Sequence, residues 1–200
     1  MDNTLTSMEM DVMGEISNIS MGNAATSLAM MVNQTTDITT PYVEVVSRSR
    51  ALDDYEDTCY FVQVHYTVGI EGNNVMILKE RDVKIMMDLM MGGDGSNCEG
   101  EVTDMHISAI SEAMNQMMGA AATSLSTILN KSVDISPPEV NSIDVESVKI
   151  FERMFESAED AFLKITFKLK IGTVIDSIMV QLYPINLAKT LCGTFLETVQ

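Results

Sequence analysis

The sequence predicts an α+β fold with an antiparallel sheet and pseudo-twofold symmetry, because it repeats itself once along its length. Residues 11–43 align with residues 108–140, and about 14 of the 33 aligned positions are identical, whereas composition alone would give about two. After these segments each half continues with the same pattern of a strand, a hairpin and a helix. We therefore expect a single domain over residues 1–200, made of two helix–strand–hairpin–helix repeats over about 6–92 and 103–198.

A long helix begins each repeat. Thr6 and Glu9 have the spacing of a capping box, which predicts a first helix from near Ser7 to about Val32. In the second repeat Asp104 is expected to cap a helix over residues 105–129. These two helices carry the most similar residues of the duplication, so we expect the functional residues to lie on them.

A hairpin follows the first strand of each repeat. Residues 162–171 largely alternate polar and apolar side chains, which is typical of a strand with one solvent-exposed face. Turns that contain glycine separate the paired strands, and the Gly-rich segment 92–102 predicts a linker between the repeats. One strand from each repeat is expected to pair across the symmetry axis.

The composition excludes several classes of function. Twelve basic and 29 acidic residues give a net charge of −17, which repels nucleic acid and anionic membranes. The three cysteines have no CxxC spacing, which argues against a zinc site or a disulfide framework. No segment has the pattern of a signal peptide or the ~20 apolar residues of a membrane span. We therefore expect a cytoplasmic protein with no nucleic-acid partner and no membrane insertion. The 18 methionines, including those in 29–31 and 86–91, are expected mainly in the core.

A polar stripe follows one face of each long helix. At 100° per residue, the first, fifth, eighth and twelfth residues of a helical segment fall within about 60° of one another. The two sets are Asp11, Glu15, Asn18 and Gly22, and Ser108, Glu112, Asn115 and Gly119. A solvated helix face is the simpler interpretation, but both repeats keep Glu, Asn and a mid-helix Gly that costs up to about 1 kcal/mol relative to Ala. The glycines indicate either close packing against another helix or room for the backbone of a docked protein.

The amide and the carboxylate suggest a specific chemistry. A carboxamide is a poor nucleophile and a weak base, but it donates and accepts hydrogen bonds together and can align a water for in-line attack on a phosphoryl group. A glutamate one turn away can pair with a lysine or arginine of a partner. The phosphoryl group and its metal would come from elsewhere, since the chain has no phosphate-cradling loop. His65 and His106 are expected to be structural, Asp94 to lie in a turn, and no metal site is predicted.

These residues resemble the signature of the CheC, CheX and FliY family of CheY-phosphate phosphatases in bacterial chemotaxis. That signature is Asp or Ser, Glu four residues later, Asn three residues after Glu, and a more distant Pro. The sequence has it twice, as Asp11, Glu15 and Asn18 with Pro41, and as Ser108, Glu112 and Asn115 with Pro138. The residues around the motifs are most similar to the FliY members, which belong to the flagellar motor switch.

The resemblance implies the pseudo-symmetric CheC-like fold and hydrolysis of the aspartyl phosphate of CheY. Asn18 and Asn115 would orient the attacking water, and Glu15 and Glu112 would contact the active-site lysine of CheY. The chain would hold no cofactor of its own, because the Mg²⁺ belongs to CheY. Both repeats keep the motif, so two working sites are expected. The remaining stripe residues would face the bound CheY: Asp11, Gly22, Ser108 and Gly119. The prolines would end the segments after the helices.

Other partners implied by the resemblance are flagellar switch proteins or the receptor deamidase CheD, at the cytoplasmic face of the flagellar basal body. The alternative function is a non-catalytic CheY-binding or scaffold domain of the switch. The duplicated amide favours catalysis, and a metal-dependent hydrolase would need ligand clusters that the sequence lacks. The chain is expected to be either a standalone CheC-like protein or a domain of a longer switch protein, and the FliY-like residues favour the second.

Overall fold

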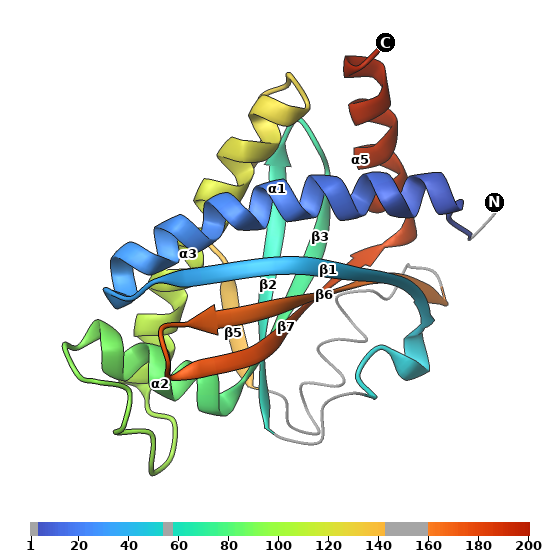
Figure 1. Cartoon of the computed structure of the whole chain (residues 1–200). Coiled ribbons are helices and arrows are strands. Elements are labelled where there is room, and N and C mark those ends of the chain that lie inside the picture. The colour runs from blue at the N-terminus through green and yellow to red at the C-terminus, as the bar shows by residue number, and fades with distance from the viewer. Residues whose placement is uncertain (1–3, 54–57, 143–159) are drawn as a thin grey trace.

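The computed structural model describes residues 4–53, 58–142 and 160–200 and shows an α+β fold, as predicted (Figure 1). The first half contains helix α1 (Ser7–Val32), strands β1 (Thr36–Ser47), β2 (Cys59–Val68) and β3 (Gly72–Lys79), and helix α2 (Glu80–Met90), with a 3-10 turn at Arg48–Arg50. The second half contains α3 (Asp104–Ile128), β4 (Asp134–Ile135), β5 (Glu139–Ser142), β6 (Ala161–Ile171), β7 (Ile175–Pro184) and α5 (Ile185–Thr198). Both halves therefore follow the predicted order of helix, strand, hairpin and helix.

One antiparallel sheet joins the two halves. Its strands run in the order β1-β6-β7-β3-β2-β4, and β5 also pairs with β2. The hairpins meet at the centre, where Val75 pairs with Leu182 and Ile77 pairs with Val180, so the expected pairing across the axis is confirmed. The first strand of each half, however, pairs with the hairpin of the other half: β1 with β6, and β4 and β5 with β2. The sheet is thus completed only by exchange of strands between the repeats.

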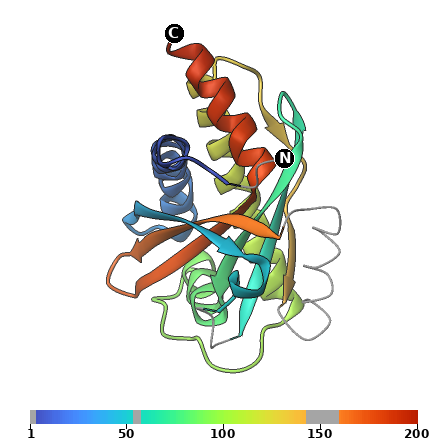
Figure 2. The same ribbon diagram turned by 90° about the vertical axis from the view of Figure 1, so that its right-hand side faces the viewer.

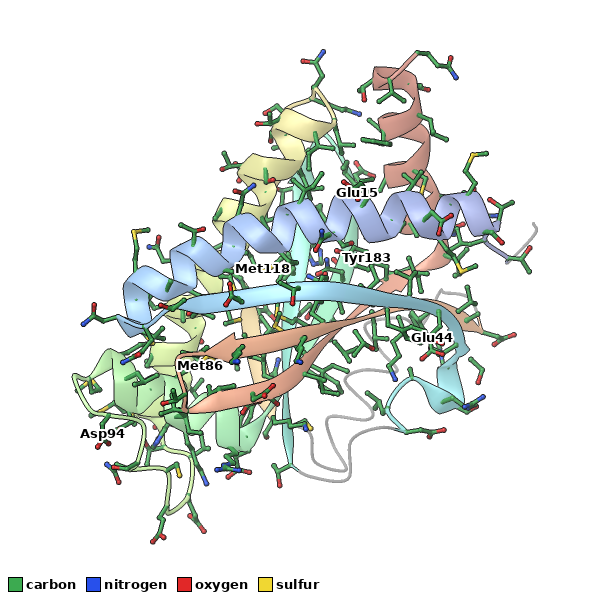
Figure 3. All side chains as sticks on the ribbon, viewed as in Figure 1. Glu15, Glu44, Met86, Asp94, Met118 and Tyr183 are labelled. Atoms are coloured by element: carbon green, nitrogen blue, oxygen red, sulfur yellow. The ribbon has the colours of Figure 1, made fainter. Side chains whose placement is uncertain are left out.

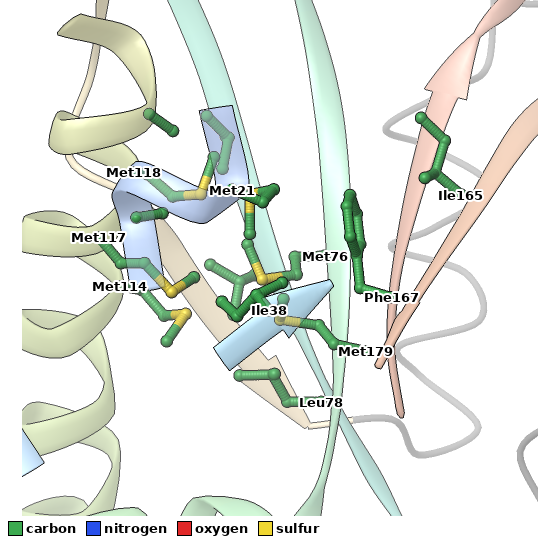
Figure 4. Packing of buried hydrophobic residues seen from close by; sticks show 14 of the residues in the cluster. Met21, Ile38, Met76, Leu78, Met114, Met117, Met118, Ile165, Phe167 and Met179 are labelled. Atoms are coloured by element: carbon green, nitrogen blue, oxygen red, sulfur yellow. The ribbon is translucent and has the colours of Figure 1, made fainter. Parts of the chain in front are cut away.

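Helices α1 and α3 pack against each other and over the sheet, with α5 beside them (Figures 1 and 2). Asn23 Nδ2 on α1 donates a hydrogen bond of 2.8 Å to Ser124 Oγ on α3. Buried methionines from both helices and from the sheet fill the space between the layers (Figure 4). The prediction that methionines fill the core is therefore confirmed for these residues: Met13, Met21, Met76, Met86, Met114, Met117, Met118 and Met179. It is wrong for Met30 and Met91, which are 75% and 67% exposed.

A buried polar group lies beneath α1 (Figure 3). Tyr183 Oη donates to Gln181 Oε1 at 3.2 Å, and Gln181 Nε2 lies 3.6 Å from the sulfur of Met21 on α1. Burial raises the pKa of Tyr183 to about 12, so this phenol remains a donor at neutral pH. These contacts tie the middle of α1 to β7 and fix which side of the helix faces away from the sheet.

Local signals explain where the long helices begin. Helix α1 begins at Ser7 and ends at Val32 as predicted, and Thr6 N–H donates to Glu9 Oε2 at 2.7 Å in a capping box. The cap of α3 is Thr103, one residue before the predicted Asp104, because His106 takes the place of glutamate. Thr103 N–H donates to His106 Nδ1 at 3.0 Å, which gives that histidine the structural role expected of it.

The two prolines of the signature interrupt strand pairing in different ways. Strand β1 continues through Pro41, with a register shift between Thr39 and Tyr42, so the prediction that this proline ends the segment is wrong. Pro138 lies in the break between β4 and β5. The missing N–H of proline accounts for both irregularities, since it removes one donor from the ladder. Over the described part of the chain, no helix is long and apolar enough to cross a membrane.

Candidate functional site

The first polar stripe lies on the open side of α1. Asp11, Glu15, Asn18 and Gly22 are all exposed, and Glu15 is labelled in Figure 3. The opposite side of the helix is fully buried against the sheet and α3 through residues such as Met13, Ile16, Met21 and Ala24. A helix with one buried side holds the other side in a fixed orientation, so the stripe is presented on a rigid support.

The second stripe lies in the same way on α3. Ser108, Glu112 and Asn115 are exposed, and Gly119 is half-buried. The two carboxylates differ in one contact: Gln116 Nε2 donates to Glu112 Oε1 at 2.9 Å, whereas Ile19 occupies the position equivalent to Gln116 on α1. The structure therefore brings each predicted set together on one helix face, in two separate sites.

The mid-helix glycines are not required for packing within the described chain. A Cβ built on Gly22 or Gly119 would meet no described atom within 4 Å beyond the backbone of its own helix. Close packing against another helix, the first explanation for these glycines, is therefore wrong. The other explanation, that the glycines leave room for the backbone of a docked protein, stays a prediction.

Replacing Gly22 and Gly119 by alanine should separate stability from function. Alanine is expected to stabilise each helix by up to about 1 kcal/mol, which raises the melting temperature by about 2–4 °C per kcal/mol for a chain of this size. If these faces dock a phosphorylated regulator, as the resemblance implies, the added methyl groups would obstruct it, so phosphate release from that regulator should fall. Thermal unfolding and phosphate release measured on the same samples test this. Higher stability with unchanged hydrolysis would show that neither glycine faces the partner.

A groove of about 560 Å³ adjoins the first stripe between α1 and β1. Tyr42, which is 64% exposed, and Val43 form its β1 wall. The two elements are close at Gly14, where an added Cβ would stand 3.4 Å from Val43 Cγ2, an ordinary van der Waals contact. The residues on its α1 side include the predicted Asp11, Glu15 and Asn18, together with Ser7 and Met10. Sequence comparison missed Tyr42, although it follows Pro41 directly, because its counterpart in the second repeat is Glu139.

A larger cavity of about 670 Å³ lies elsewhere, between the start of α2 and the β6–β7 hairpin, and no stripe residue lines it. Asp82, 5% exposed, is its most buried charged residue. Burial raises the pKa of Asp82, while a hydrogen bond from Ser177 and the charges of Lys79 and Arg81 partly oppose that rise. An acid at the third position of a helix also interacts favourably with the helix dipole, which offsets part of the cost of burying the Asp82 charge.

Asp82→Asn is expected to increase stability at neutral pH and to lose that advantage in acid. The folded-state pKa of Asp82 lies above its ordinary value of 3.8, so the ionised carboxylate is buried at a cost above that pH, and asparagine avoids the cost. As the pH falls below 3.8 the carboxyl becomes protonated in the unfolded state as well as in the folded state, so the advantage of asparagine shrinks. Urea unfolding of both proteins at pH 7 and pH 3.5 measures the difference. An advantage of the same size at both pH values would contradict this explanation.

The other candidates from the sequence have structural roles or no partners for chemistry. Asp94 lies in a turn and accepts a hydrogen bond of 3.0 Å from Ser96 N–H, and its bonds to Ser96 lower the pKa of the Asp94 carboxyl. His65 is exposed on β2. Burial raises the pKa of the Cys192 thiol to about 11, which keeps it protonated and unreactive at neutral pH. Among the described residues, no group of three or more His, Cys, Asp or Glu side chains is placed to hold a metal ion.

Comparisons with known proteins agree with this geometry. The model of the CheC-like family matches residues 8–45 and 105–142, the two segments that contain the stripes. The chain is 43% identical over 194 residues to the flagellar motor switch phosphatase FliY of Bacillus subtilis (strain 168). That match covers 97% of this chain but 51% of the relative, so the chain spans about half the length of that protein.

Solved structures show the same architecture. The crystal structure of Thermotoga maritima FliY matches with a TM-score of 0.87 and 36% identity, over 97% of this chain and 98% of the other. The FliM middle domain from H. pylori matches with a TM-score of 0.70 at 12% identity, over 95% and 99% of the two chains, which shows a shared fold alone. The duplicated motif, the strand-exchanged sheet and the similarity to FliY establish that this chain belongs to the CheC-like family.

Proposed function

We propose that the chain hydrolyses the aspartyl phosphate of the phosphorylated response regulator CheY. The observation that carries this proposal is the repeated pair of exposed Glu and Asn side chains, Glu15 with Asn18 and Glu112 with Asn115, each on a rigid helix beside an unobstructed glycine. The phosphatase name of the Bacillus subtilis relative supports the same reaction class.

In this mechanism each site supplies one half of the catalytic machinery. The amide of Asn18 or Asn115 accepts a hydrogen bond from the attacking water and donates another, which holds the water in line with the phosphorus. Glu15 or Glu112 pairs with the lysine beside the phosphorylated aspartate and sets the register of docking. CheY supplies the phosphoryl group together with its Mg²⁺. The increase in rate comes from positioning, because the bound water is already oriented for attack and does not have to reach that orientation by chance.

The proposed setting is the flagellar switch, on the cytoplasmic side of the basal body. The motor-switch name of the 43% identical relative supports this setting. The net charge of −17 would steer regulators or switch proteins that present a basic surface.

Phosphate release from phosphorylated CheY, with and without the chain, tests the proposal. The expected result is an acceleration that rises with the concentration of the chain until CheY is saturated. The alternative is a docking or scaffold domain. It would bind phosphorylated CheY while the decay continued at the spontaneous rate, and that outcome would reject the catalytic proposal.

A further inference from the structure

The surfaces around the two stripes differ in their apolar residues. On α1, Met8, Ile19 and Met30 are 65%, 39% and 75% exposed. They are spaced by 11 residues, which is close to three helical turns, so they lie along one line that passes beside Glu15. Ile19 follows Glu15 by four residues, so the two side chains are neighbours on the surface of α1, and a protein that docks at Glu15 would cover Ile19 as well.

The second repeat keeps only the first member of this row. Met105, equivalent to Met8, is 61% exposed on α3. Gln116 and Thr127 occupy the positions of Ile19 and Met30, and both are exposed polar side chains. The Gln116 amide is directed to Glu112, to which it donates a hydrogen bond of 2.9 Å. The surface beside Glu112 is therefore polar where the surface beside Glu15 is apolar.

The walls beside the stripes differ in the same sense. Tyr42 forms the exposed wall of the groove next to the first stripe, and Glu139, which is exposed, is the residue aligned with it in the second repeat. Ser111 is the residue aligned with Gly14. The first site thus has an apolar wall on the strand side and an apolar residue on the helix side, while the aligned residues of the second repeat are a carboxylate and an amide.

We propose that the two sites are unequal and that the first is the docking site of higher affinity for phosphorylated CheY, with Ile19 and Tyr42 as the residues that confer the difference. This inference rests on the proposed function. Phosphorylated CheY is the expected occupant of the groove, because the groove is continuous with the first stripe: Asp11, Glu15 and Asn18 line it. A protein that brings its phosphoryl group to Asn18 therefore covers Tyr42 as well. At the second site an apolar side chain of the same partner would meet Glu139 and Gln116, whose desolvation costs affinity.

Two proteins with one intact motif each allow the sites to be compared. Asn115→Ala leaves the first site, and Asn18→Ala leaves the second. We expect KM for phosphorylated CheY to be about tenfold lower for the first-site protein, equivalent to about 1.4 kcal/mol. In the first-site protein, Tyr42→Glu and Ile19→Gln should each raise KM severalfold with little change in kcat.

Substitutions in the opposite direction, made at the second site, show whether a change in KM could result from misfolding. In the second-site protein, Glu139→Tyr and Gln116→Ile are expected to lower KM, a gain that misfolding cannot imitate. Met91→Gln is the matched control, since Met91 is 67% exposed at the end of α2 and lines neither site. Its KM should equal that of the parent protein.

Binding of CheY loaded with beryllofluoride, a stable phosphoryl mimic, distinguishes this inference from the proposed function. If the parent chain does not accelerate hydrolysis but Tyr42→Glu still weakens its binding to this form of CheY, the docking site stands and the catalytic proposal is rejected. Equal KM values for the two single-site proteins, or no effect of Tyr42 and Ile19, would overturn the inference and leave the catalysis standing. If the Tyr42 and Ile19 variants change only the self-association of the chain, measured by light scattering, the exposed apolar residues serve contacts between copies of the chain. That result would also overturn the inference. Absence of any CheY binding would reject both.

Discussion

Replacing Asn18 and Asn115 together by alanine is expected to return the hydrolysis of phosphorylated CheY to its spontaneous rate. In the proposed mechanism each amide is the group that both donates to and accepts from the attacking water. A misplaced reacting group costs about 100-fold in rate, so no residual acceleration should survive the loss of both amides. Single-turnover phosphate release measures the effect, and each single variant should retain the activity of the other site.

Asn23→Ala is the matched control for this loss. Asn23 is also an exposed amide on α1, but it lies off the stripe and donates to Ser124 Oγ on α3. Its removal is expected to cost about 1 kcal/mol of stability and to leave hydrolysis unchanged. If the double variant retained most of the acceleration while Asn23→Ala lost it, the stripe would not be the active surface.

Separating the two halves of the chain is expected to abolish folding of each half. A fragment of residues 1–97 would have β1 without β6, and a fragment of residues 98–200 would have β4 and β5 without β2. Both fragments would also expose the edges that join β3 to β7, and unpaired backbone groups at such edges favour aggregation.

Circular dichroism and size-exclusion chromatography of the fragments, alone and mixed, measure this dependence. Each fragment alone should be unfolded or aggregated, and the mixture should recover a folded complex. A full chain cleaved within 97–100 after folding is the control and should remain intact. Cooperative unfolding of either fragment alone would contradict the dependence on strand exchange.

Local patterns in the sequence predicted the elements well, because the information lies within a few residues. The capping box at Thr6 and Glu9 placed the start of α1 correctly. The same approach misplaced the cap of α3 by one residue, because a histidine rarely stands where His106 accepts a hydrogen bond from Thr103. The exposed stripes followed from helical periodicity alone.

Long-range pairing and the docking surface could not be obtained in that way. Both repeats have the same strand pattern, so the sequence does not specify whether β1 pairs with its own hairpin or with β6. A search for residues that are identical in the two repeats also cannot find Tyr42 and Ile19, because these residues differ from their counterparts in the second repeat. The place of Tyr42 beside Glu15 and Asn18 depends on the approach of β1 to α1, which only the tertiary structure reveals.

The most direct test of water orientation by the two asparagines compares binding with hydrolysis in the Asn18→Ala, Asn115→Ala protein. Affinity for CheY loaded with beryllofluoride is measured beside phosphate release from phosphorylated CheY. We expect an affinity within a few-fold of the parent chain together with hydrolysis at the spontaneous rate. Loss of affinity in parallel with hydrolysis would show that the amides serve docking rather than catalysis, and that result would reject water orientation by the asparagines.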